Sequence, residues 1–70
     1  MQKIWDNCKA PNKGSLVEFV LIGDRRIVGY YLGFDAEKNM YALCHSTYDI
    51  EKKYFVSKQN IKIQYVLALR

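Results

Sequence analysis

The chain has 70 residues, of which 50% are hydrophobic and 26% are charged. A domain of this length buries only about 60% of the surface that its unfolded chain exposes, so a full core and a deep substrate pocket do not both fit. This excludes the larger nucleotide-binding and barrel enzyme folds. The 14% aromatic content and the single proline argue against disorder. We therefore expect one small folded domain over 1–70.

The charge balance is moderately basic. Eleven Lys and Arg residues against seven Asp and Glu give a formal net charge of +4. Such an excess attracts polyanions over long distances, but it is equally typical of a solvated surface that keeps a protein soluble. The basic residues are spread along the chain. The net charge alone therefore does not identify a binding partner.

Cysteine content and hydropathy indicate the compartment. Two cysteines, Cys8 and Cys44, do not make the disulfide framework of a small secreted domain. No apolar run approaches the roughly 18 residues needed to span a bilayer, and the first residues lack the apolar stretch of a signal peptide. We expect a cytoplasmic protein with no membrane partner.

The N-terminal segment 1–10 is a short helix candidate. Ile4 and Cys8 are four residues apart, and Trp5 lies beside that stripe, so one helical face can dock on a core. Pro11 and Gly14 end the pattern. A helix this short is marginal alone and depends on packing.

Five strands are expected after the helix, over 16–69. From Leu16 onward the hydrophobic period is two, and Gly23-Asp24 interrupts it with a tight hairpin. The next strands are predicted over 25–34, 40–46, 53–56 and 61–69, separated by short polar turns. Gly29 and Gly33 inside the second strand are typical of a sharp bend or a close backbone approach. The fold class expected is therefore all-β with one short helix: a strongly bent, five-stranded barrel of the Sm-like or SH3-like kind.

Catalytic and metal chemistry find little support. His45 is the only histidine and is adjacent to Cys44, so the two side chains point to opposite faces of a strand. A zinc site needs about four ligands, which these residues do not supply. We interpret Cys44 as a core residue and His45 as an ordinary surface residue. No enzyme activity, metal or cofactor is predicted.

The stretch 17–43 carries a spaced set of turn and bend residues. A turn glycine, Gly23, is followed six residues later by a bend glycine, then by Gly-Phe-Asp and by an Asn four residues past the Asp. This pattern resembles the first sequence motif of the Sm and Sm-like (Lsm) protein family. The matching positions are Gly23, Gly29, Gly33, Phe34, Asp35 and Asn39.

The second family motif is matched less fully. Its best counterpart is 56–61, where the strand residues fit but Ser57 stands at the place of the family's Arg and Lys58 at the place of its Gly. The family's base-stacking side chain would lie two residues before the Asn, and Glu37 occupies that place. A carboxylate there repels phosphate and supplies no aromatic stack.

The resemblance implies a homomeric ring of five to seven subunits, in which the fourth strand of one subunit pairs with the fifth strand of the next. Joining strand edges head to tail also satisfies backbone groups that small barrels leave open. The expected subunit-interface residues are Tyr54, Val56, Ile61, Ile63 and Tyr65.

The resemblance also implies that single-stranded, uridine-rich RNA binds at the pore of the ring. Asn39 is the candidate base reader and Asp35 its orienter, while Lys58 and Lys38 are candidates for phosphate contact. The complete set of expected RNA-binding residues is Asp35, Glu37, Lys38, Asn39, Ser57 and Lys58. From the residues alone, Asp35 and Asn39 are equally explained by a turn with Asx hydrogen bonds.

Two alternatives remain open at this point. The first is the same ring used as a structural scaffold with altered or lost RNA binding. The second is a monomeric SH3-like barrel that binds a peptide, with Tyr30, Tyr31, Tyr41 and Tyr48 as an aromatic groove. Against that groove stands the simpler interpretation that these tyrosines pack on a sheet face.

Overall fold

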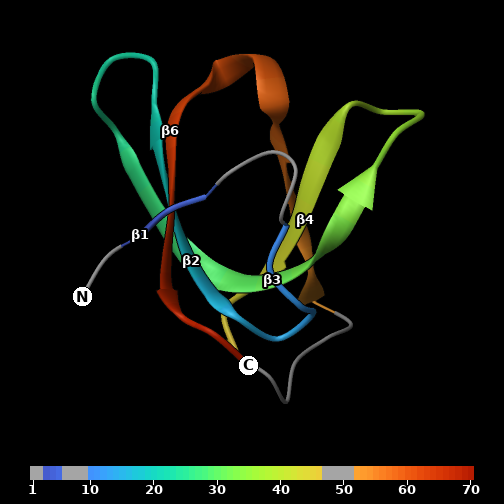
Figure 1. The fold of residues 1–70 in the computed structure, drawn as a ribbon. Helices are drawn as coiled ribbons and strands as arrows, with labels where there is room; N and C mark the ends of the chain where they lie inside the picture. Colours follow the sequence, from blue (N-terminus) through green and yellow to red (C-terminus); the bar gives the residue numbers. More distant parts are fainter. Residues whose placement is uncertain (1–2, 6–9, 47–51) are drawn as a thin grey trace.

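A computed structural model describes residues 3–5, 10–46 and 52–70. The described residues form one antiparallel sheet with the strand order β1-β6-β2-β3-β4-β5. The elements are β1 (Lys3–Ile4), β2 (Leu16–Leu21), β3 (Arg26–Asp35), β4 (Met40–Cys44), β5 (Tyr54–Ser57), the 3-10 turn η2 (Lys58–Asn60) and β6 (Ile61–Ala68). Figure 1 shows the long β3 curving along its length, so that the sheet wraps around a single core.

The mostly β architecture expected from the hydrophobic period is confirmed. Each of the five predicted strands has a counterpart among β2 to β6, with small differences at the ends. A curved antiparallel sheet of this size is compatible with a small β-barrel. None of the described segments is a helix long and apolar enough to cross a membrane.

The predicted N-terminal helix is not confirmed. Lys3 and Ile4 are instead paired as β1 with Val66 and Tyr65 of β6, whereas residues 1–2 and 6–9 of the predicted helix lie outside the described residues. The backbone N–H of Trp5 continues the ladder by donating to the Gln64 carbonyl oxygen at 2.7 Å. An isolated helix of this length gains little, whereas an open sheet edge offers hydrogen bonds at once.

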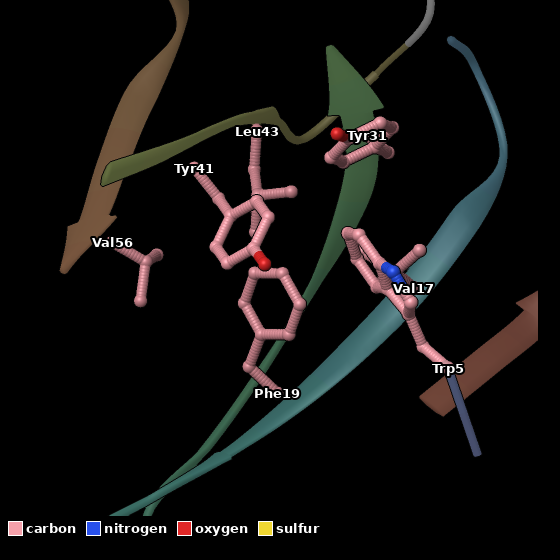
Figure 2. Packing of buried hydrophobic residues seen from close by; sticks show 7 residues of the cluster. All are labelled: Trp5, Val17, Phe19, Tyr31, Tyr41, Leu43 and Val56. Carbon is pink, nitrogen blue, oxygen red and sulfur yellow. The ribbon is translucent and has the colours of Figure 1, made fainter. Parts of the chain in front are cut away.

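The core is built around Trp5 and strand residues that alternate inward. Val17, Phe19 and Leu43 are fully buried. The Trp5 ring lies 5.6 Å from Phe19 and 5.0 Å from Tyr41, centroid to centroid. Figure 2 shows the rings of Tyr41 and Phe19 meeting in the middle of this cluster. The N-terminal segment is thus part of the hydrophobic core.

The aromatic groove considered for a peptide-binding barrel is wrong for two of its members. Tyr31 and Tyr41 are only 6% and 5% exposed and belong to the core cluster. Tyr30 is half-buried, and Tyr48 lies outside the described residues. Burial raises the pKa of the Tyr31 and Tyr41 hydroxyls above the usual value, because it penalises the phenolate. The simpler interpretation of these two tyrosines, packing on a sheet face, is confirmed.

The glycines of β3 act as the sequence predicted. At Gly29 a Cβ atom would lie 2.5 Å from the Tyr54 hydroxyl oxygen and 3.1 Å from the Cys44 carbonyl oxygen, so this is a close approach. Gly33 has φ +145°, and the pairing of β3 with β4 shifts register between Tyr31 and Gly33. A bulge at this point bends the strand.

Other local predictions are also confirmed. Gly23 and Asp24 both have positive φ in the β2–β3 turn, and the Leu21 N–H donates to the Arg25 carbonyl oxygen at 2.7 Å. Cys44 is fully buried, and its thiol donates to the Ser46 carbonyl oxygen at 3.1 Å. His45 is exposed beside the Tyr54 ring.

Candidate nucleic-acid interface

The β3–β4 turn and η2 lie side by side at one end of the sheet. The Lys58 backbone N–H donates to the Asn39 carbonyl oxygen at 3.1 Å, and the adjacent Met40 pairs with Ser57 across β4 and β5. In Figure 1 both connections lie at the same end of the molecule, η2 in orange and the turn in yellow-green. The structure therefore brings together the polar residues that the sequence predicted from two separate turns.

Asp35 holds the conformation of the β3–β4 turn. Its Oδ1 accepts hydrogen bonds from the backbone N–H groups of Glu37 at 3.1 Å and Lys38 at 3.2 Å. Asn39 closes the turn with φ +55°, a left-handed conformation that asparagine tolerates better than most residues. Asp35 thus stabilises the turn that leads to Asn39, and the Asx-turn interpretation of Asp35 is confirmed.

Phe34 supplies an aromatic surface next to η2. Its side chain is 40% exposed, and the Lys58 Nζ lies 5.4 Å from the ring centroid. The ring also packs on Tyr41 at 4.9 Å. Phe34 is paired with Tyr41, and Tyr41 with the buried Val56, so Phe34 lies on the core side of the sheet at its rim.

A second exposed ring, that of Phe55 on β5, lies on the opposite face of the same sheet. Phe55 is 38% exposed and is in register with Ala42 and Gly33, one position out of phase with Phe34. The Lys38 Nζ lies 4.6 Å and the Lys53 Nζ 5.9 Å from its ring centroid. Exposed cation–π contacts of this kind contribute about 0.5–1 kcal/mol each.

An open hollow surrounds Phe55 on this outer face. Its floor is short of side-chain atoms because Gly33 and Ala42 lie there, and a Cβ added at Gly33 would meet no atom within 4 Å. The full lining is Gly33, Phe34, Asp35, Ala36, Glu37, Lys38, Ala42, Lys53 and Phe55. The surface thus combines a flat ring, ammonium groups and carboxylates.

Sequence reasoning did not select Phe55, Lys53 or, as a contact residue, Phe34. In the sequence, Phe34 marks only the Gly-Phe-Asp step of the first motif. A usable signal existed at Phe55, which is large, apolar and out of phase with the buried Val56 in an edge strand. Its partner Lys53 is two residues away, whereas the proximity of Lys38 follows only from the tertiary structure.

The predicted interface residues lie on the edge strand β5 and on β6, which lies between β1 and β2 in the sheet. Val56 is buried in the core of its own chain, so only its backbone remains for pairing, while Tyr54, Ile61, Ile63 and Tyr65 are half-buried. Within the described residues, β5 has no strand on its outer side. The outer side of β6 is occupied by the β1 segment along Gln64–Val66.

No group of metal-ligating side chains is present among residues 3–5, 10–46 and 52–70. Comparisons of the chain with protein-family models, with curated proteins and with solved structures gave no match. The geometry of the interface is therefore the basis on which a function can be inferred.

Proposed function

We propose that this protein is a non-catalytic, cytoplasmic RNA-binding module that takes single-stranded, uridine-rich RNA at the β3–β4 turn and η2. The observation that carries the proposal is the hydrogen bond from the Lys58 N–H to the Asn39 carbonyl oxygen. This bond brings Asn39, whose side-chain amide is the proposed base reader, next to Lys58, whose ammonium lies over the exposed Phe34 ring. Proteins usually bind single-stranded nucleic acid with aromatic rings, on which bases stack, next to basic side chains.

The exposed ring of Phe34 takes the place of the stacking side chain missing at Glu37. A base–aromatic stack is worth about 1–3 kcal/mol, more than an exposed ammonium–ring contact. An incoming base therefore displaces the Lys58 ammonium from the Phe34 ring, and the ammonium moves to the phosphate. The Asn39 amide then hydrogen-bonds the base edge, while Asp35 keeps the turn in place through its two backbone contacts.

We propose further that the fold is an Sm-like barrel assembled as a homomeric ring of five to seven subunits. The unpaired outer side of β5 supports this, because an open strand edge is a template for pairing with another chain. The neighbour's β6 offers Ile61–Ile63 directly, since β1 covers the stretch from Gln64 to Val66. A closed ring gathers one copy of each turn around a shared pore.

RNA binding is tested by comparing oligo-uridine with oligo-cytidine across a salt series. Asn39→Gly is the preferred variant because glycine keeps the left-handed backbone, whereas alanine would add strain at φ +55°. We expect Asn39→Gly to abolish the preference for uridine. Equal weak affinity for both strands, unchanged by Asn39→Gly, would overturn base reading and leave the scaffold alternative.

Assembly is tested by mass under native conditions. A ring of five to seven subunits has five to seven times the chain mass of 8.2 kDa. The variant Phe55→Pro removes a backbone N–H and the ring from the edge strand β5, where proline is tolerated best, and should therefore weaken assembly. A wild-type species of 8.2 kDa would remove the ring and with it the shared pore.

A further inference from the structure

The hollow around Phe55 has its own ligand chemistry, separate from the Asn39 and Lys58 junction. Register places Phe55 on the face opposite Phe34, so one base cannot stack on both rings. Two ammonium groups, from Lys38 and Lys53, lie over the Phe55 ring and come from different parts of the chain. Their convergence offers a phosphate two cations beside an aromatic surface.

The carboxylates of this hollow restrict which base fits. Glu37 is exposed at the lining, and its carboxylate has no hydrogen bond or ion pair with the part of the chain that the structure describes. An ionised carboxylate only accepts hydrogen bonds. Guanine offers it two adjacent donors, N1–H and the N2 amino group, whereas uracil offers one N–H between two carbonyl oxygens that repel it. The chemistry therefore matches guanine.

We infer that the outer-face hollow is a second nucleotide site for a guanosine in the bound RNA strand. The guanine ring stacks on Phe55, Glu37 accepts from its Watson–Crick edge, and Lys38 and Lys53 leave the ring to contact the phosphate. The small residues Gly33 and Ala42 leave room for the base. This inference rests on the proposed function, because the strand continues from the Asn39 side of the turn onto the outer face.

The experiment measures the affinity of a short oligo-uridine strand and of the same strand extended by one guanosine or one uridine at either end. We expect guanosine at one end to tighten binding about tenfold, and an added uridine to change it little. Phe55→Leu should remove the guanosine gain while oligo-uridine affinity stays unchanged. Glu37→Gln should reduce the advantage of guanosine over uridine.

A second measurement keeps the two proposals distinguishable. Guanosine monophosphate titrated alone should shift the NMR signals of the Phe55 ring, and uridine monophosphate should not. If oligo-uridine binds but guanosine adds nothing, or if Phe55→Leu keeps the gain, the outer site is overturned and the proposed function stands. If the nucleotide shifts Phe55 but oligo-uridine does not bind, the outer site stands and the uridine site fails.

Discussion

The Tyr54 hydroxyl lies over Gly29 and donates a hydrogen bond to the Val28 carbonyl oxygen at 3.3 Å. Tyr54 belongs to the edge strand β5, whereas Gly29 and Val28 belong to β3, and the two strands are separated in the sheet by β4. The contact is possible only because Gly29 has no side chain. It ties the edge strand to the middle of the sheet.

Gly29→Ala should destabilise the fold by about 1–3 kcal/mol, because its Cβ would overlap the Tyr54 hydroxyl and crowd the Cys44 carbonyl. Urea unfolding followed by circular dichroism measures the change. The double variant Gly29→Ala with Tyr54→Phe should cost less than the sum of the two single changes, since the phenylalanine lacks the oxygen. Simple additivity would show that the hydroxyl is not the obstacle.

Trp5→Ala should be severely destabilising, by about 3–5 kcal/mol, because it leaves a large cavity beside Phe19 and Tyr41. For a domain this small, such a loss removes most of the folded population. The measurement is chemical denaturation by far-UV circular dichroism. Ile22→Ala is the matched control, since Ile22 is 66% exposed and its truncation should cost less than about 0.5 kcal/mol. Equal stability of the two variants would contradict the placement of Trp5.

Stability should be lost in alkaline solution. Burial raises the pKa of Tyr31, Tyr41 and Tyr54 in the folded state above the ordinary value of 10.0. Well below pH 10 these hydroxyls are neutral in both states, so they cause no pH dependence. As pH rises from 10 through the folded pKa values, ionisation favours the unfolded chain and the free energy of unfolding falls.

Urea midpoints between pH 7 and about 11 test this expectation. Tyr31→Phe should flatten the alkaline decline, because phenylalanine carries no hydroxyl to ionise. Tyr30→Phe serves as a control at a half-buried neighbour outside the core cluster. An unchanged slope for Tyr31→Phe would contradict the role of burial.

Asp35→Ala should cost about 1 kcal/mol, because the Glu37 and Lys38 N–H groups lose their acceptor. Asp35→Asn should restore most of this stability, since an amide oxygen accepts the same bonds. If Asp35 supports RNA binding only by stabilising the turn, Asp35→Asn should also keep the RNA affinity that Asp35→Ala loses. Loss of affinity in the stable Asn variant would instead indicate a direct contact of the carboxylate with RNA.

Lys58→Gln should weaken RNA binding and make it less sensitive to salt. Each phosphate that a cation neutralises on a single strand contributes about 0.7 to the slope of log affinity against log salt. We expect the slope to fall by about that amount for each phosphate that the Lys58 ammonium neutralises in the wild-type complex. Lys13→Gln is a control at an exposed lysine in the loop before β2. A slope unchanged by Lys58→Gln would mean that its ammonium does not reach phosphate.

The strands and turns of this protein follow from local features of the chain. Alternating residues such as Val17 and Phe19 mark one buried face. Gly23 and Asp24 supply the positive φ that a tight hairpin requires, and Gly29 permits a close approach. These features depend on local backbone preferences and a period of two, so they can be read without knowing what packs against them.

The conformation of the N-terminal segment and the composition of the interface depend instead on contacts between distant parts of the chain. Local spacing favoured a helix around Ile4, but an open edge of β6 and a core space for Trp5 were available only once distant strands had assembled. For the same reason, no pattern in the chain placed Lys38 over Phe55 or joined Lys58 to Asn39. Such contacts link residues far apart in sequence, and their geometry is set by the register and bend of the whole sheet.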